Sequence, residues 1–459
     1  MALPIIITWL PTLIVPVVLP ALLIICHRAG NIRRMKAARR VLEEEPISAA
    51  DPPSSSTCQE SITTQNDSKT EVSKWHWPSI SANRKGFPPV LNDALFRLAL
   101  HVLEESGDET SVVSPFSLGM CFATLNMGAK DKTSEEITDR IFKGIPKDEV
   151  AAVLHNALGA MMSSAGWSRK KPPVDIAAAI YVDLTVDVLE QFENDVAKFF
   201  ACPTKSADFQ NDSEAERVAL NKFVEDHTGG RIRDLFDARL ITSATRLVAV
   251  NAMFMKAKFE KPFNPRETYM EKFYNEDGTT KQVPTMHGTD AQCAFLECEN
   301  FVFCSKCFKP AGFAFFVMVP KNEPVKDLKK KFTSYNEKFS SIFTKAEKNV
   351  EVQISLPKFT AEATFKELKG SMETLGVSKV FSEEANFEGL RDNGPLFVEE
   401  IVHKAVLELD ENGATAAAAI GQPIRLCAIP MARVLKADRP FLFGISFENT
   451  PVFVGQFYG

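Results

Sequence analysis

The spacing of apolar residues predicts helices mainly in the first half of the chain and strands mainly in the second. In residues 91–106, LNDALFRLALHVLEES, apolar side chains recur every three or four positions, as on one face of an amphipathic helix. Further helical patterns cover residues 115–127, 150–162, 186–199 and 214–225, the last of which begins with the capping pair Ser213 and Glu216. Strand-like runs cover residues 246–256, 301–319, 350–361, 397–409 and 441–457. This order predicts an α+β architecture around large sheets.

The first 26 residues carry no charge and form a segment of their own. As a helix they would reach about 39 Å, more than the roughly 30 Å of a bilayer's hydrocarbon core. Basic residues follow this segment, between residues 27 and 40, whereas a secretory signal carries them in front. By the positive-inside rule, such a flank prefers the cytoplasm. Residues 1–26 are interpreted as a membrane anchor or a signal segment, with a wrongly joined first exon as a third alternative.

Residues 27–88 are first basic and then rich in Ser, Thr and Pro, with little periodicity, which is typical of a linker. The folded domain is therefore expected to cover residues 89–459. The net charge of -6 and a pI near 5.8 argue against a nucleic-acid partner, because phosphates demand a basic surface.

The nine cysteines predict few or no structural disulfides, since their number is odd and they are spread over the whole chain. Four of them, Cys293, Cys298, Cys304 and Cys307, lie close together. The second pair follows too soon for a usual zinc site, and a strand over residues 301–308 would place Cys304 and Cys307 on opposite faces. We expect buried or free thiols, no metal site and no cofactor.

Residues 410–441 begin with an unusual stretch, DENGATAAAAIGQPIRLCAIPMARV, in which four consecutive alanines stand between two glycines. The simplest interpretation is one short helical turn, because alanine is the best helix former. An alternative is that small, uncharged side chains allow this segment to slide between two strands of an existing sheet.

Six segments, in order, resemble the serpin family. They are SVVSPFSLGMCFATLNMGAKDKTSEEI (111–137), LNKFVEDHTGGRIRDLF (220–236), TRLVAVNAMFMKAKFEKPF (245–263), ISLPKFTAEATFKELKGSMETLGVSKVF (354–381), LFVEEIVHKAVLELDENGATAAAA (396–419) and DRPFLFGISFENTPVFVGQF (438–457). The resemblance spans residues 90–459. It implies a serpin fold of three β-sheets with eight to nine helices, and it identifies the alanine-rich stretch as the hinge of an exposed reactive-centre loop.

The resemblance also implies a function. A serpin of the inhibitory kind is a suicide substrate of serine or cysteine endopeptidases: it traps the acyl-enzyme by inserting its cleaved loop into the central sheet. The implied partner is the target protease, in a covalent complex with a monomeric inhibitor. The alternative is a non-inhibitory serpin that acts as a carrier, a chaperone or a membrane-tethered interaction module. An enzyme in its own right is disfavoured, because no G-x-S-x-G or other nucleophile signature is present.

Family roles can be carried over residue by residue. The hinge comprises Glu411, Gly413, Ala414, Thr415, Ala416, Ala417, Ala418 and Ala419. Ala414 and Thr415 stand where inhibitors usually have Thr or Ser and then Glu, but both are small and neutral. Ala257 and Phe259 replace the family's Gly and Trp where the loop first inserts, which predicts a looser gate.

Other residues match supporting positions of the family. Lys358 and Glu411 match a pair that bridges the hinge to a neighbouring strand, and Ser117, Asn251 and His403 match a hydrogen-bonded cluster beneath the sheet. His403 could otherwise serve as a catalytic base, but no nucleophile accompanies it.

The scissile bond is predicted at Cys427 and Ala428, because the family's bait residue lies about sixteen positions after the hinge glutamate. Counting back from Arg439 gives Leu426 or Cys427, and Arg425 is the alternative bait for trypsin-like enzymes. A small, mildly apolar cysteine suits a shallow elastase-like pocket or a cysteine protease.

Two sequons, at Asn66 and Asn211, would accept glycans in the secretory lumen. Because the family's targets are mostly extracellular, we expect a secreted protein or a membrane-anchored one with its serpin domain in the lumen or outside the cell.

Overall fold

The computed structural model describes residues 87–163, 174–414 and 433–459, apart from single positions at 256, 310, 335, 367, 392, 393 and 400. The predictions for residues 1–86, which include the apolar segment, the linker and Asn66, lie outside this part of the chain. So do those for residues 415–432. Among the helices of the described residues, none is long and apolar enough to cross a membrane.

Nine α-helices lie in the described residues: α3 (Pro89–Leu103), α4 (Pro115–Gly128), α5 (Asp131–Glu136), α6 (Lys147–Ser163), α7 (Glu190–Phe200), α8 (Phe209–His227), α9 (Val325–Thr333), α10 (Phe339–Lys345) and α11 (Leu368–Leu375). Single turns add η1 (Glu104–Ser106), η2 (Ile137–Ile141), η3 (Pro265–Glu267) and η4 (Lys379–Phe381). Helix α4 begins where the sequence dictates: the Ser114 side chain accepts from the backbone N–H of Ser117, and Pro115 occupies the first helical position.

The central sheet has the strand order β3 (Thr204–Ala207), β2 (Val174–Asp183), β4 (Leu247–Met255), β12 (Ile401–Asp410) and β11 (Phe359–Phe365). Strands β4 and β12 are parallel and pair directly, from Ala249 and Ile401 to Phe254 and Val406. Just beyond this pair, the two-residue strand β13 (Gly413–Ala414) lies between β12 and β5 (Ala257–Phe259).

Two further sheets complete the fold. One has the order β1 (Ser111–Val113), β16 (Thr450–Phe457), β15 (Phe441–Phe447), β9 (Phe313–Pro320) and β8 (Phe301–Lys309). The other has the order β14 (Arg433–Lys436), β10 (Glu347–Pro357), β7 (Thr280–Glu297) and β6 (Thr268–Tyr274). Strand β8 pairs with β5 and β7, so hydrogen bonds join all three sheets into one curved network. The predicted α+β fold with three sheets is confirmed.

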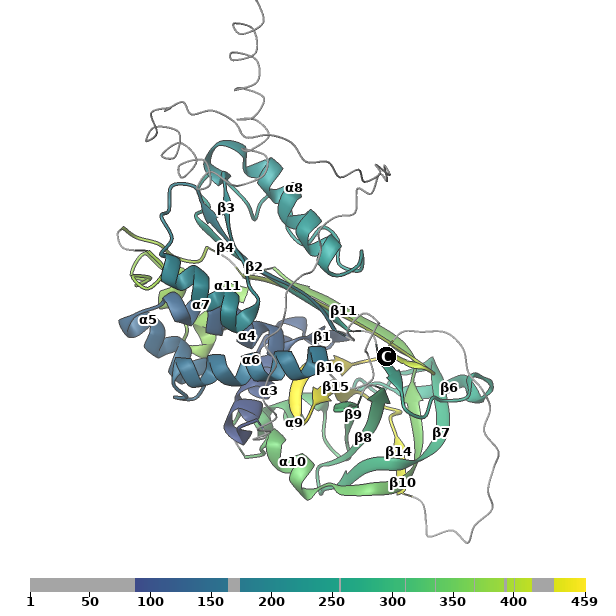
Figure 1. Cartoon of the computed structure of the whole chain (residues 1–459). Helices are drawn as coiled ribbons and strands as arrows, with labels where there is room; N and C mark the ends of the chain where they lie inside the picture. Colours follow the sequence, from purple (N-terminus) through teal and green to yellow (C-terminus); the bar gives the residue numbers. More distant parts are fainter. Residues whose placement is uncertain are drawn as a thin grey trace, which may run out of the picture. The chain divides into compact units, whose positions relative to one another are not determined.

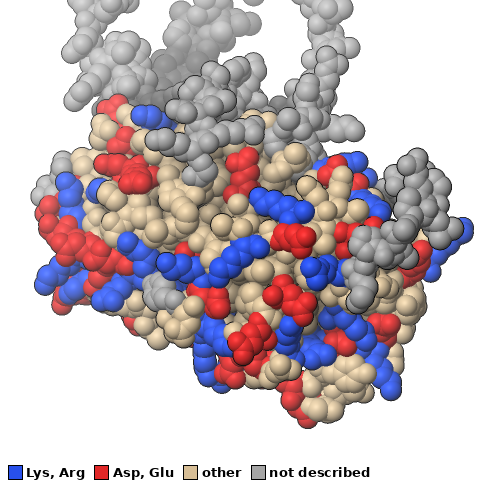
Figure 2. Space-filling model, turned by 90° about the horizontal axis from the view of Figure 1, so that it is seen from below, with Lys and Arg blue, Asp and Glu red and all other residues tan. Residues whose placement is uncertain are grey.

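Helices cover both faces of the central sheet, with α4 on one side and α8 on the other (Figure 1). Leu220, Phe223 and Val224 of α8 pack in one apolar cluster with Val402 and Val406 of β12. Strand β4 is buried along its whole length, whereas β12 is partly exposed at Glu408, so a strand added between them must bring small or apolar side chains where helices cover the sheet. On the face of the molecule in Figure 2, basic and acidic side chains are interspersed, as 53 basic and 59 acidic residues lead one to expect.

Candidate functional site

The start of the predicted hinge already forms a strand within the central sheet. Strand β13 is antiparallel to β12, with Gly413 opposite Asp410 and Ala414 opposite Leu409. It is also antiparallel to β5, with Gly413 opposite Lys258. The chain that leaves β12 thus turns back at once into a position between two strands.

Two backbone hydrogen bonds hold the turn that precedes this strand. The N–H of Phe259 donates to the carbonyl of Asn412 at 2.6 Å, and the N–H of Phe263 donates to that of Glu411 at 2.8 Å. The hinge is therefore joined to the β5 side of the site before its loop begins.

Gly413 is the residue that permits this close approach. Its φ of +127° is a conformation that L side chains rarely adopt. A Cβ at this position would lie 2.7 Å from both the Ala257 carbonyl oxygen and the Phe259 nitrogen. Both contacts are with backbone, which cannot move away cheaply, so the site requires glycine.

Glu411 anchors the turn through its side chain. Its Oε2 accepts from Lys358 Nζ at 2.9 Å, and its Oε1 accepts from Thr268 Oγ1 at 2.8 Å. Burial on its own raises the pKa of this carboxyl, but the hydrogen bonds from Lys358 and Thr268 outweigh it and leave the pKa below its ordinary value. The pair that the sequence matched to the family is thus in contact, and Thr268 is a partner that it missed.

Further along the sheet, the β4 and β12 pair lies over a buried polar cluster. His403 Nδ1 lies 3.3 Å from Asn251 Oδ1, and Asn251 Nδ2 donates to the carbonyl of Ser117 at 2.7 Å. The structure brings these three predicted residues together.

Ser114 completes the cluster and was missed by sequence reasoning. Its N–H donates to His403 Nε2 at 3.0 Å, and its hydroxyl donates to the carbonyl of Val452 at 2.8 Å. The available signal was its place before Pro115, which marks it as a helix cap.

The hydrogen bonds assign the protonation state of His403. Because Nε2 accepts from a backbone N–H, Nδ1 carries the proton and donates to Asn251, which is the neutral form. Burial lowers the pKa of His403 to about 3. The side chain therefore joins strand to helix, and among the described residues no hydroxyl group hydrogen-bonds to its ring, as a nucleophile activated by it would.

Phe259, at the position where the family has Trp, is 1% exposed. Its ring stacks on Phe308 at a centroid distance of 4.8 Å and meets Phe263 edge-on at 5.7 Å. Beside these rings lies a buried ion pair between Lys306 and Asp290, a feature that sequence reasoning also missed. Its signal was a lysine between Cys304 and Phe308 on the inward face of an apolar strand.

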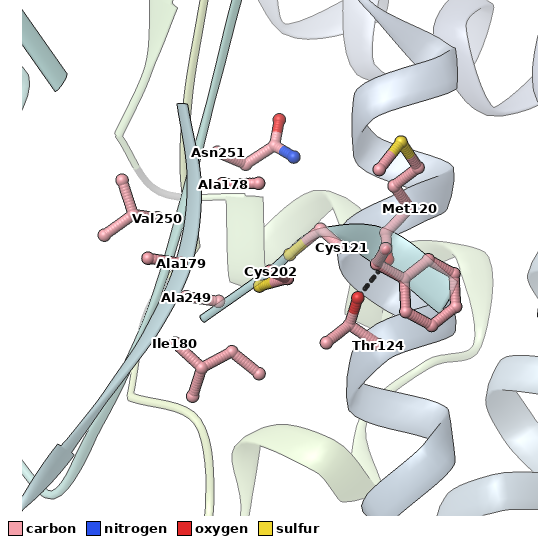
Figure 3. A pocket seen from close by; sticks show the side chains of 11 residues that line it. Met120, Cys121, Thr124, Ala178, Ala179, Ile180, Cys202, Ala249, Val250 and Asn251 are labelled. Carbon is pink, nitrogen blue, oxygen red and sulfur yellow. Dashed lines mark hydrogen bonds between the residues drawn. The ribbon is translucent and has the colours of Figure 1, made fainter. Parts of the chain in front are cut away.

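A small hollow, with room for about 10 Å³ and open in part to solvent, lies between α4 and strands β2 and β4 (Figure 3). Cys121 and Cys202 point into it, and burial raises the pKa of both thiols. Both are therefore protonated at neutral pH, which disfavours a cysteine nucleophile here. Of the neighbouring pair on β8, Cys304 is buried and Cys307 is exposed.

The remaining predicted residues are only partly described. Thr415 to Ala419, Arg425, Leu426, Cys427 and Ala428 fall outside the described residues. Asn211 is exposed in the first turn of α8, where its N–H and Nδ2 both donate to Asp208 Oδ1.

Comparisons with known proteins agree with this geometry. The sequence profile described as "Serpin (serine protease inhibitor)" matches residues 90–459. A "Serine protease inhibitor" of Cyanea capillata is 30% identical over 76% of this chain and 92% of its own length. The corticosteroid-binding globulin of Oryctolagus cuniculus is 27% identical over 81% of this chain and 95% of its own.

A solved structure adds evidence on the fold alone. A serpin of the insect Tenebrio molitor superposes with a TM-score of 0.71 at 24% identity, over 83% of this chain and 99% of the other.

Proposed function

Because this chain belongs to the serpin family, we propose that it inhibits serine or cysteine endopeptidases as a suicide substrate. The observation that carries the proposal is the position of β13, a strand that has begun to form between β5 and β12.

Further insertion is favourable on hydrogen-bonding grounds. Beyond β13, strands β4 and β12 form one parallel ladder. A strand inserted between them replaces this ladder with two antiparallel ones. Two ladders hold more hydrogen bonds than one, and antiparallel pairing is slightly more stable per residue than parallel pairing. Insertion of a cut loop would therefore add hydrogen bonds to the native sheet.

The register of β13 predicts where the following residues would lie after insertion. If it continues, Ala416 comes opposite Leu407 and Thr415 opposite Glu408. Opposite residues share a face, so Ala416 would face the buried interior with Leu407, which is 0% exposed. The alanines thus supply small side chains where the sheet has no room for large ones.

The proposed reaction begins as ordinary proteolysis. The protease nucleophile attacks the carbonyl of Cys427, forms an acyl bond and releases the amine of Ala428. About fourteen inserted residues at ~3.3 Å each then move the acyl bond by about 46 Å. Deacylation needs an ordered oxyanion hole and a base within hydrogen-bond reach, so a protease deformed by this displacement stays trapped.

The test is incubation with a panel that includes an elastase-like, a trypsin-like and a cysteine protease. We expect an SDS-stable complex with at least one protease, and none with its variant lacking the catalytic nucleophile. Cleaved inhibitor should also unfold at a higher temperature than the intact protein. If every protease only cuts the loop and the cleaved form gains no thermal stability, the inhibitory function is wrong.

Mass spectrometry of the released C-terminal peptide identifies the bait bond. A peptide that begins at Ala428 supports Cys427, one that begins at Cys427 supports Leu426, and one that begins at Leu426 supports Arg425. The last result would replace the proposed elastase-like or cysteine protease with a trypsin-like target.

The second candidate function is that of a carrier, which the similarity to a corticosteroid-binding globulin favours. The hollow beside α4 adds no support, because it has room for only about 10 Å³, whereas small-molecule sites typically span roughly 300–1,000 Å³. Saturable binding of an apolar probe, together with failure of the protease test, would support this alternative.

A further inference from the structure

Lys306 is a buried cation at the point where the loop would insert. Its side chain is 6% exposed and that of its partner Asp290 is 7% exposed. Its ammonium lies 5.2 Å from the ring centroid of Phe259 and 5.1 Å from that of Phe263. One carboxylate and two aromatic rings therefore surround the charge.

The same two aromatic residues hold the hinge. The backbone N–H groups of Phe259 and Phe263 donate to the carbonyls of Asn412 and Glu411, at 2.6 and 2.8 Å. Lys306 on β8 and Asp290 on β7 come from strands that do not pair with β13. Lys306 contacts the rings of Phe259 and Phe263, whose backbone N–H groups bind the hinge. The ion pair is therefore linked to the hinge through these two residues.

Stability alone does not explain such a pair. Replacing a buried ion pair by neutral groups of similar volume is often neutral or stabilising, because desolvation offsets the attraction of the charges. A cation that is held in place by a carboxylate does, however, restrain the rings that it contacts, because the cation–π attraction depends on the position of the cation over the ring.

We propose that Lys306 and Asp290 are positioning residues for loop insertion, which hold Phe259 and Phe263 so that their N–H groups keep the hinge in register. This inference rests on the proposed inhibitory function. In this proposal, the two residues control how fast a cut loop inserts relative to hydrolysis of the acyl bond. A hinge held less firmly inserts later, so a larger share of inhibitor is cut without trapping protease.

The test uses the full chain with the double substitution Lys306→Met and Asp290→Asn, which leaves no buried charge unpaired. The matched control is Lys321→Met with Glu297→Gln, an ion pair at 2.7 Å that also begins on β7 but is partly exposed. Hydrogen exchange is measured at the amides of Phe259 and Phe263 and at those of β15. The number of inhibitor molecules consumed per protease trapped is measured on the same samples.

We expect exchange at Phe259 and Phe263 to become roughly tenfold faster in the double variant, the effect of a desolvated cation–π contact on a local opening. The β15 amides should not change, and inhibitor consumption should rise several-fold. The control pair should match the wild type in both measurements.

Three results would overturn the inference: unchanged exchange at the two amides, equal acceleration at β15, or faster local exchange with unchanged inhibitor consumption. Failure of the wild type to trap any protease would instead refute the proposed function. The exchange measurement would then still decide whether the ion pair holds Phe259 and Phe263.

Discussion

At the scale of single residues, the polar groups beneath the central sheet are matched donor to acceptor. His403 accepts a hydrogen bond from the N–H of Ser114 and donates one to the side-chain oxygen of Asn251, which in turn donates to the carbonyl of Ser117. These bonds join β12, β4 and the start of α4. A protonated imidazole would have two donors and so could not accept from Ser114.

His403 is therefore predicted to make stability depend on pH. Its folded pKa of about 3 lies below the ordinary value of 6.5, so between these values the unfolded chain binds a proton that the folded chain does not. Stability should fall by up to about 1.4 kcal/mol per pH unit as the pH drops below 6.5.

The measurement is urea unfolding of the wild type and His403→Gln from pH 8 to pH 4. At pH 8 the difference between them reports the lost hydrogen bonds, and it should shrink toward pH 4. A difference that stays constant over this range would show that His403 does not titrate on unfolding.

Glu411 is predicted to stabilise the hinge at neutral pH. Glu411→Ala removes the acceptor of Lys358 and Thr268 at a buried position, which should lower the free energy of unfolding by about 1–3 kcal/mol. Because the folded pKa of Glu411 is lowered, its contribution is present above the ordinary pKa and lost as the pH falls through the lowered one.

The matched control is Glu362→Ala, since Glu362 pairs with Lys404 but is 52% exposed. Urea unfolding should show a change within about 0.5 kcal/mol for this variant. Equal losses in the two variants would mean that Glu411 acts as an ordinary surface charge.

The sequence could place Lys358, Glu411, Ser117, Asn251 and His403 because they follow family motifs. It could not place Thr268, because its partner Glu411 lies 143 positions away in the chain. Nor could it place Asp290, because no local pattern marks this residue, although its partner Lys306 is only 16 positions away. Local signals did mark the other two residues: Ser114 is a helix cap before proline, and Lys306 is a charged residue on the inward face of a strand.

At the scale of elements, long amphipathic segments were predictable. The helical pattern of residues 91–106 is α3, and that of 115–127 is α4. The single run predicted at 441–457 is two strands, because Glu448 and Asn449 have positive φ and form a turn. Strand β2 was missed because its alanines carry little strand preference and its position in the sheet decides its conformation.

Strand β13 could not be predicted from any local pattern. Two residues form a strand only because β5 and β12 offer unpaired backbone groups on either side. The sequence contains the glycine that permits this strand, but it does not show which strands would lie on either side.

The register of β13 leads to a prediction about adjacent loop residues. Ala416→Arg would place a charge on the face of Leu407 and should convert the inhibitor into a substrate that is cut without trapping. Thr415→Arg would lie opposite Glu408, whose side chain is 35% exposed, and should still form the complex.

Both variants are incubated with a protease that the wild type traps, and the SDS-stable complex is quantified against cut inhibitor. Complex formation by Ala416→Arg, or its loss in Thr415→Arg alone, would show that the inserted strand does not follow the register of β13.

At the scale of the whole molecule, inhibition requires the chain to remain in a conformation with fewer ladders than it could form. Under the proposed function, the direct pairing of β4 with β12 beside the two-residue β13 is the arrangement that precedes cleavage of the loop. A target protease would supply that cut, so the compartment of the domain decides which proteases it can meet.

The compartment can be tested through the sequon at Asn211. Asn211 is exposed, and the sequon Asn211-Asp212-Ser213 lies where α8 is kinked at Asp212, with φ −142° and ψ 54°, so a glycosylating enzyme can reach the backbone there. Protein from cells with a secretory pathway should migrate faster after N-glycosidase treatment, and Asn211→Gln should remove part of that shift while Asn66→Gln removes the rest. No shift in the wild type would contradict a lumenal domain. It would favour the orientation that the basic residues after residue 26 predict, in which the serpin domain faces the cytoplasm and its targets are proteases of the cell interior.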